Sequence, residues 1–407
     1  MKIASIVLIP GVLACASVQL VSATETAKVK DKVVHSFGSG TDGQRPLADL
    51  TDVKGTLYGT TYAGGAFNSG AIFALDPKTG AETVTYSFCS QQNCPDGQEP
   101  EGGLIDVKGA LYGTTNAGGT SGDGVLFALD LSTGAETVLY SFCAQQNCTD
   151  GASPYGTLTD VNGILYGTTA RGGVNGYYTG GTVFAFDPNT GMENVLYSFC
   201  SQQNCTDGQG PNAGVINVKG TLYGTTGGGG STGNGTVYSL DPKSGAENVL
   251  YSFCTQQNCA DGGFPYAALT NVKGTLFSTT VYGGAYNGGT VFTLDPSTGA
   301  ETVVHSFGNY PDGRFPYANL IDVKGTLYST TLGGGENSCT QYGGCGTVFS
   351  VNPNTGNVKV VYSFCSQEDC VDGEQPVAEV IAVKGKLFGT TDIGGEYGYG
   401  TVFSLKR

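Results

Sequence analysis

"GGLIDVKGALYGTTNAGGTSGDGVLFALDLSTGAETVLYSF", residues 102–142, contains four short runs that are typical of β-strands. The runs are GGLIDV, ALYGTT, VLFALD and ETVLYSF. They are rich in β-branched and aromatic residues, and Gly, Asn, Asp or Ser separates them. Lys108-Gly109 and residues 131–134 predict short turns, whereas NAGGTSGDG predicts a longer loop. No stretch keeps an apolar period of 3.6 residues, so we expect almost no helix.

The same unit occurs seven times along the chain. The phrase that ends in Ser-Phe returns every 51 to 57 residues, and the phrases LYGTT and GTVF recur with it. Repeats of this length indicate a repeat architecture. Because each unit holds four antiparallel strands, the sequence predicts an all-β fold, a seven-bladed β-propeller. A linear β-solenoid is the alternative.

The ends of the chain favour a closed ring over a solenoid. Residues 32–37, KVVHSF, have the pattern of a fourth strand, and the last run, GTVFSLKR, has the pattern of a third. The N-terminal strand would complete the last blade and remove an open sheet edge. We therefore expect the propeller to span residues 32–407. The expected blades are 45–88, 99–142, 153–199, 210–253, 264–307, 315–364, and 375–405 together with 32–37.

The first residues have the pattern of a secretory signal peptide. One lysine is followed by an apolar run and by Val21-Ser22-Ala23, which predicts cleavage after Ala23 and a linker over 24–31. A membrane anchor is disfavoured because the run is short and contains Pro10. A lipoprotein site at Cys15 is the other alternative. We expect a secreted, extracellular or periplasmic protein with no transmembrane segment in the mature chain.

The charge of the chain excludes some partners. The net charge is −15, and phosphate-rich ligands need clustered Lys and Arg, so nucleic acid and anionic membrane surfaces are disfavoured. We expect a monomer. No phosphate loop is present, because the Gly-rich segment 227–235 lacks a lysine and a following helix. We expect no cofactor.

Twelve cysteines remain after Cys15 is set aside, and they fall in six close pairs. Where Gly38 and Gly308 replace the first cysteine of a pair, the second is absent too and the loop is three residues shorter. A pair that is lost as a unit favours a disulfide, and export to an oxidising compartment permits one. Zinc would need four ligands, and each loop offers two, so we expect no metal. The predicted disulfides are Cys89–Cys94, Cys143–Cys148, Cys200–Cys205, Cys254–Cys259, Cys339–Cys345 and Cys365–Cys370.

The repeated phrases LYGTT, a Gly-Gly loop, GTVF, VLYSF and DGxxP resemble those of the GloVer tandem-repeat family. The resemblance covers Val33 to Arg407. It implies an exported bacterial repeat protein of unknown biochemical role, and it supplies no catalytic residues. The chain departs from the family by its cysteine pairs and by the lack of a C-terminal sorting tail, which leaves surface anchoring open.

One face of the propeller is expected to carry any binding site. In an antiparallel blade the short turns VKG and DPKTG lie at one end, and the long variable loops lie at the other. Binding residues are usually found on variable loops, so we expect a carbohydrate or protein ligand there. The alternative is that these aromatic residues pack between blades. The candidate ligand-binding residues are Tyr62, Arg171, Tyr177, Tyr178, Tyr282, Tyr286, Tyr342, Tyr397 and Tyr399, with Tyr155, Phe264, Tyr266, Arg314, Phe315 and Tyr317 after the Asp-Gly pairs.

Support for catalysis is weak. His35 and His305 stand where other units have tyrosine, and the Asp of DGxxP occurs in all seven units, which indicates structural roles. Three loop acids, Glu336, Asp392 and Glu396, break the sevenfold pattern and are the candidate catalytic residues, since paired carboxylates cleave glycosidic bonds. The leading hypothesis is a non-catalytic binding or scaffold module. The alternatives are a glycan-active hydrolase or lyase and a purely structural envelope protein.

Overall fold

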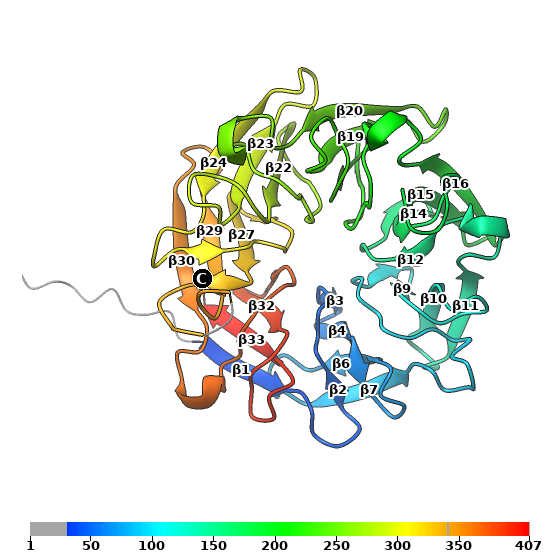
Figure 1. Cartoon of the computed structure of the whole chain (residues 1–407). Coiled ribbons are helices and arrows are strands. Elements are labelled where there is room, and N and C mark those ends of the chain that lie inside the picture. The colour runs from blue at the N-terminus through cyan, green and yellow to red at the C-terminus, as the bar shows by residue number, and fades with distance from the viewer. Residues whose placement is uncertain (1–30, 340–341, 407) are drawn as a thin grey trace, which may run out of the picture.

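The computed structural model describes residues 31–339 and 342–406, which form a ring of seven four-stranded antiparallel sheets, a seven-bladed β-propeller (Figure 1). The predicted signal peptide and most of the predicted linker lie outside the described residues. The first three sheets, from inner to outer strand, are β3 (Thr51–Val53), β4 (Thr56–Thr61), β6 (Ala71–Leu75) and β7 (Glu82–Ser87); β8 (Ile105–Val107), β9 (Ala110–Thr115), β10 (Val125–Asp130) and β11 (Glu136–Ser141); β13 (Thr159–Val161), β14 (Ile164–Arg171), β15 (Thr182–Asp187) and β16 (Met192–Ser198).

The next three sheets repeat this order. They are β17 (Ile216–Val218), β18 (Thr221–Thr226), β19 (Thr236–Leu240) and β20 (Glu247–Ser252); β21 (Thr270–Val272), β22 (Thr275–Thr280), β23 (Thr290–Leu294) and β24 (Glu301–Ser306); β26 (Ile321–Val323), β27 (Thr326–Thr331), β29 (Thr347–Val351) and β30 (Val358–Ser363). The inner strand β8 contacts β3 and β13, β13 also contacts β17, and β21 contacts β26, so these inner strands lie side by side in the ring.

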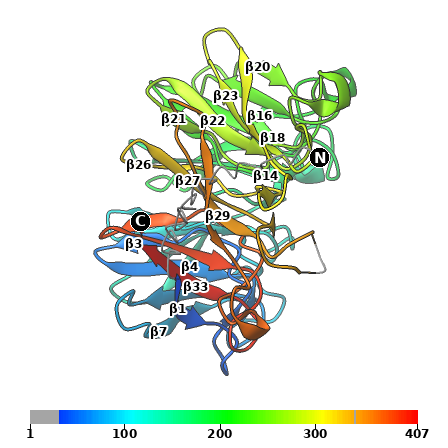
Figure 2. The same ribbon diagram turned by 90° about the vertical axis from the view of Figure 1, so that its left-hand side faces the viewer.

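The seventh sheet joins the two ends of the described chain. Its strands are β31 (Ile381–Val383), β32 (Lys386–Thr391), β33 (Thr401–Lys406) and, as the outermost strand, β1 (Asp31–Ser36). β1 pairs antiparallel with β33, and both views place the two strands side by side (Figures 1 and 2). The predicted closure by the N-terminal strand is therefore confirmed.

Neighbouring sheets are held together by one repeated aromatic contact. The Phe that follows each outer strand packs at a steep angle against the Phe or Tyr of the third strand in the next sheet, as Phe88 does against Phe127 with ring centres 5.1 Å apart and ring planes at 62°. The ring centres of the other six pairs are 4.9 to 5.1 Å apart. Both rings are buried, and each such side chain contributes about 1.5 to 3 kcal/mol. Gly113 leaves room for this packing, since a Cβ there would lie 2.7 Å from Cζ of Phe127.

Each outer strand contains a β-bulge just before its Tyr or His. In the first sheet Ile72 pairs with Tyr86 and Phe73 pairs with Val84, so Thr85 is the extra residue. The other six sheets show the same shift. A bulge re-aims the side chains that follow it. Here the bulge lies directly before the Tyr or His whose side chain contacts the crossing. We call a crossing the segment that leads from the outer strand of one sheet to the inner strand of the next.

Helix is almost absent from the described residues, as predicted. The helical elements there are four three-residue 3-10 helices, each in a crossing between sheets: η1 (Gln146–Cys148), η2 (Gln203–Cys205), η3 (Gln257–Cys259) and η4 (Glu368–Cys370). Five shorter strands join crossings to neighbouring loops: β2 (Gly43–Gln44), β5 (Ala63–Gly64), β12 (Ala152–Pro154), β25 (Gly313–Arg314) and β28 (Gly333–Gly334). Across residues 31–339 and 342–406, no helix has the length and apolarity that a membrane crossing requires.

Candidate functional site at the channel mouth

The crossings between sheets and the long loops after the second strands form one face of the ring. Antiparallel pairs tie each crossing to the loop of the same unit, as between Gln98 and Ala117 or between Gly263 and Tyr282. The structure therefore brings the variable segments together at one end of the channel. The tight Lys-Gly turns lie at the opposite end.

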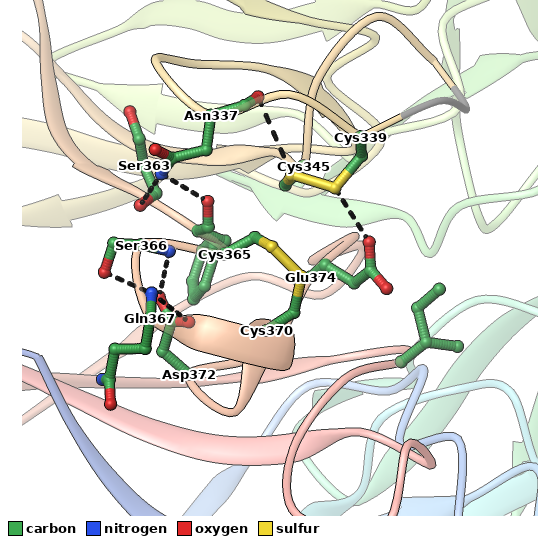
Figure 3. Close-up of a disulfide and its surroundings, with 12 residues drawn as sticks. Asn337, Cys339, Cys345, Ser363, Cys365, Ser366, Gln367, Cys370, Asp372 and Glu374 are labelled. Atoms are coloured by element: carbon green, nitrogen blue, oxygen red, sulfur yellow. Dashed lines mark hydrogen bonds between the residues drawn. A yellow bond between two sulfur atoms is a disulfide. The ribbon is translucent and has the colours of Figure 1, made fainter.

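Five crossings are closed by a disulfide and organised by a buried aspartate. In Figure 3 the disulfide Cys365–Cys370 closes one crossing, and Asp372 accepts hydrogen bonds from the backbone N–H groups of Ser366 and Gln367. The Tyr362 hydroxyl also donates to Asp372, at 2.7 Å. Disulfides are thus present where the sequence predicts them, and the sixth, Cys339–Cys345, lies in a neighbouring loop, where Glu374 Oε2 is 3.0 Å from Cys339 Sγ. The other crossing disulfides are Cys89–Cys94, Cys143–Cys148, Cys200–Cys205 and Cys254–Cys259.

The two crossings without cysteines use histidine in place of tyrosine. His35 Nε2 lies 3.1 Å from Asp42 Oδ2, and His305 Nε2 lies 2.7 Å from Asp312 Oδ2. The shorter loop brings the carboxylate closer to the strand, so that the smaller imidazole reaches it. The histidines and the Asp-Gly aspartates therefore meet each other in the crossings.

Three of the predicted ligand-binding tyrosines cover these two crossings. A Cβ at Gly38 would lie 2.5 Å from Cδ2 of Tyr399 and 3.1 Å from Cβ of Tyr397, and one at Gly308 would lie 3.1 Å from Cβ of Tyr286. The three tyrosines remain about half exposed. They pack where the other crossings have a disulfide, so their first role is structural.

A cluster of half-buried aromatic residues spans the crossings of the fifth and sixth sheets. Tyr282 contacts Phe264 and Phe315, with ring centres 5.8 and 5.4 Å apart. Phe315 in turn contacts Tyr342 at 6.4 Å, and Arg314 lies over the Phe315 ring. Tyr266 and Tyr317 stack with ring centres 5.7 Å apart and ring planes at 14°. We call this set the aromatic cluster: Phe264, Tyr266, Tyr282, Phe315, Tyr317 and Tyr342.

Other predicted residues lie elsewhere on the same face. Tyr62 lies under the guanidinium of Arg45, which is 5.2 Å from the ring centre. Arg171 lies over Tyr177, whose hydroxyl donates to Asp123 at 2.6 Å. Tyr178 packs edge-on against Tyr177 and is 83% exposed. The structure thus groups Tyr282 and Tyr342 but places Tyr62 and the Arg171 group in separate positions.

The three candidate catalytic acids make contacts in different places. Asp392 is buried and forms a two-point ion pair with Arg45, with N–O distances of 2.8 and 3.1 Å. The backbone N–H groups of Glu336 and Glu396 donate to Ser363 and Ser36, which end the outer strands β30 and β1. The contacts of Asp392 thus lie at the loop after β32, whereas those of the two glutamates lie at the outer strands.

Carboxyl groups that are not among the predicted site residues lie near the ring axis at the channel mouth. Asp49 accepts hydrogen bonds from the Glu379 N–H at 2.8 Å and from Thr157 Oγ1 at 3.3 Å. These residues come from the first, seventh and third sheets, which can meet only near the ring axis. Burial raises the pKa of Asp49, and burial together with the charge of Asp49 raises the pKa of Glu379 well above its usual value.

Glu101 is a third carboxyl group at the mouth. Asn116 donates to it at 3.0 Å, and burial raises its pKa although a hydrogen bond from Tyr155 opposes the shift. A signal for Asp49 and Glu379 existed in the sequence. The residue three positions after the conserved proline of each unit is different in most units, and it is acidic only at Asp49 and Glu379.

A second set of carboxyl groups lies between the outer strands. Burial, followed by the charge of the nearest crossing aspartate, raises the pKa of each of five glutamates to about 7: Glu82, Glu136, Glu193, Glu247 and Glu301. The sixth sheet has Val358 at this position, in the same register with its neighbouring strand.

The opposite end of the ring carries a hollow of its own. A cavity of about 540 Å³ lies between the inner strands β26 and β31 and is lined by Lys324 and Lys384 among others. Its lining includes neither a ring of the aromatic cluster nor a channel carboxyl group. It lies at the end that the short turns between first and second strands form, and Asp322 lines it beside the two lysines.

Known proteins share the repeat and the fold of this chain. Residues 20–180 match the family model of the Gloeobacter/Verrucomicrobia repeat, and no curated protein matches the chain. The extracellular domain of a hybrid two-component system from B. thetaiotaomicron has a TM-score of 0.60 at 12% identity; the match covers 93% of this chain and 40% of that one. An oligogalacturonate lyase from Vibrio parahaemolyticus has a TM-score of 0.52 at 11% identity, with 94% of both chains covered.

Identities this low establish the fold alone. The family match confirms the resemblance of the repeat phrases over residues 20–180, and the structure continues the same four-stranded unit through all seven sheets. The chain is thus a seven-bladed β-propeller whose residues 20–180 match the Gloeobacter/Verrucomicrobia repeat.

Proposed function

We propose that this protein is an exported, non-catalytic propeller that binds a carbohydrate at the channel mouth. The observation that carries the proposal is the aromatic cluster. Its members come from two successive crossings and from the loops after β22 and β27, they break the sevenfold pattern, and Tyr282 and Tyr342 are each about 40% exposed.

The chemistry of the mouth suits a sugar. Aromatic rings present flat apolar faces for the C–H groups of a pyranose, and tyrosine hydroxyls and carboxylates accept hydrogen bonds from its hydroxyl groups. Glu101 and Asp49 add such acceptors near the axis. Because the chain has a net charge of −15, the ligand is a neutral rather than an acidic glycan.

Export accounts for the six disulfides. Such bonds persist in oxidising compartments, and the N-terminal segment has the pattern of a cleaved signal. The protein therefore acts outside the cell or in the periplasm. A surface-exposed glycan is then an accessible ligand.

Glycan-array screening followed by calorimetry with the best oligosaccharide tests the proposal. We expect Tyr282→Ala and Tyr317→Ala to weaken binding at least tenfold. Tyr178→Ala serves as the matched control, because this exposed tyrosine lies outside the aromatic cluster, and it should bind like the unmodified protein. Equal affinity in all three variants would reject the channel mouth as the site. Absence of any glycan ligand would favour a purely structural envelope protein.

The same glycans also test the enzymatic alternative. The raised pKa values of Glu101 and Glu379 favour it, because a protonated carboxyl group can act as a general acid. New reducing ends or unsaturated products, lost in Glu101→Gln or Glu396→Gln, would replace the binding module by a hydrolase or a lyase. Binding without turnover supports the proposal.

A further inference from the structure

The crossing that closes the ring brings together three residues of the types that bind transition metals. His35 lies on β1, Asp42 lies in the crossing that follows, and Glu82 lies on β7 of the first sheet. Their Nε2 and carboxylate oxygen atoms all lie within 4.8 Å of one another. The three residues come from two sheets that are neighbours only because the ring closes.

Two buried carboxylate oxygen atoms of this group lack hydrogen-bond partners. The side chain of Asp42 is 7% exposed, and its Oδ1 has no hydrogen-bond partner among the described residues; Oε1 of Glu82 is likewise buried without one. In the crossing after β20, by contrast, Asp261 accepts hydrogen bonds on both oxygens, from Tyr251, Thr255 and Gln256. Two neighbouring buried carboxylates beside one imidazole are compensated either by a bound cation or by a proton.

We propose that His35, Asp42 and Glu82 bind a divalent transition-metal ion of the Zn²⁺ class. Neutral imidazole and carboxylate are ligands for Zn²⁺. Metal–ligand bonds of about 2.0 Å in a tetrahedron place two ligand atoms about 3.3 Å apart. The separation of 3.1 Å between His35 Nε2 and Asp42 Oδ2 fits this geometry. A water molecule completes the fourth position, and the ion braces the ring where no disulfide does.

The chain contains its own comparison. The other histidine crossing has the pair His305 and Asp312, but Val358 occupies the register position that Glu82 has in the first sheet. Asp312 Oδ1 also accepts a hydrogen bond from the Gly313 N–H at 2.9 Å. That crossing therefore has two candidate ligands and no unpartnered carboxylate oxygen, and it should not bind the ion.

Titration of the tag-free, EDTA-treated protein with Zn²⁺ tests the proposal, by calorimetry and by metal analysis after dialysis. We expect one equivalent of Zn²⁺ and a rise in the thermal unfolding temperature on binding, as for any ligand of the folded state. His35→Gln keeps a side-chain donor for Asp42 but loses the ligand nitrogen, and it should weaken binding at least tenfold. Glu82→Gln should do the same without touching the closing strand.

The matched control is His305→Gln, which should bind Zn²⁺ like the unmodified protein. Absence of Zn²⁺ binding by the unmodified protein would overturn the proposal, and a proton shared by the two carboxylates would then satisfy them. Equal affinity in His35→Gln, Glu82→Gln and His305→Gln would also overturn it, because the ion would then bind elsewhere.

Discussion

The crossing after Phe253 and the crossing after Phe307 perform the same task by different means. The first is closed by the Cys254–Cys259 disulfide, and Asp261 gathers the Tyr251 hydroxyl and the backbone of Thr255 and Gln256. The second is three residues shorter, has no cysteine, and holds Asp312 by His305 and Gly313.

The sheet contacts on either side of the two crossings are alike. Phe253 meets Phe292, and Phe307 meets Phe349, each with ring centres 4.9 Å apart and an interplanar angle of 66°. The difference is therefore confined to the loop. The repeat therefore keeps the apolar contact between sheets and varies the polar crossing. The crossing is stabilised in two ways, and only the longer form contains a disulfide.

Replacement of the crossing aspartate should give the largest difference in stability loss between the two crossings. Asp261→Ala leaves the Tyr251 hydroxyl, the Thr255 hydroxyl and two backbone N–H groups without their acceptor in a buried site, so we expect a loss of at least about 3 kcal/mol. Asp312→Ala removes two hydrogen bonds in a more open site and should cost about 1 to 2 kcal/mol. Urea unfolding measures both. Equal losses would show that the number of hydrogen bonds does not decide the strength of a crossing.

Removal of the disulfide should have the next largest effect. The double variant Cys254→Ala and Cys259→Ala opens a ring of six residues, and the chain-entropy model gives a loss of about 2 kcal/mol. The urea midpoint of the double variant, compared with that of the unmodified oxidised protein, gives the loss. An unchanged midpoint would mean that Asp261 stabilises the disulfide-closed crossing without help from the disulfide, as Asp312 stabilises the shorter crossing.

The smallest expected effect is a dependence of stability on pH. Burial and the charge of Asp261 raise the pKa of Glu301 to about 7, from an ordinary value near 4.5. Between these values the folded chain holds a proton that the unfolded chain has released, so stability falls as the pH rises from about 5 to 8. Since Glu301 is partly exposed, we expect on the order of 1 kcal/mol or less.

Glu301→Gln should flatten this slope, which urea midpoints at pH 5 and pH 8 can measure. The outer strand of the sixth sheet provides the control, because it has Val358 at the position where the fifth sheet has Glu301. Val358→Gln should therefore leave the slope as it is in the unmodified protein. If Glu301→Gln does not change the slope of stability against pH, the pH dependence comes from groups other than Glu301.

Much of the fold was predictable because each unit repeats its own signals. The LYGTT and GTVF phrases mark strands, and the Lys-Gly and Asp-Pro-x-x-Gly phrases mark turns. The complementary end strands gave the closure. The disulfides were predictable for the same reason, since Gly38 and Gly308 revealed that the two cysteines of a crossing are lost together.

The candidate site was less predictable because its contacts join residues that only ring geometry brings together. Arg45 and Asp392 meet across the closure, and Asp49 meets Thr157 and Glu379 at the axis. Periodicity inside one unit contains no information on such contacts. Variable tyrosines also carried an ambiguous signal: Tyr282 joins the aromatic cluster, whereas Tyr399 covers a crossing without a disulfide.

The pairing of β1 with β33 has a consequence for the order of assembly. Of the strands described, β1 is synthesised first and β33 last, and they are partners in one sheet. The six sheets between them can each form from contiguous chain as synthesis proceeds. The seventh has to wait, with β1 an unpaired edge, until its partner arrives. The seventh sheet, and with it the closed ring, can therefore be complete only after β33 has been synthesised.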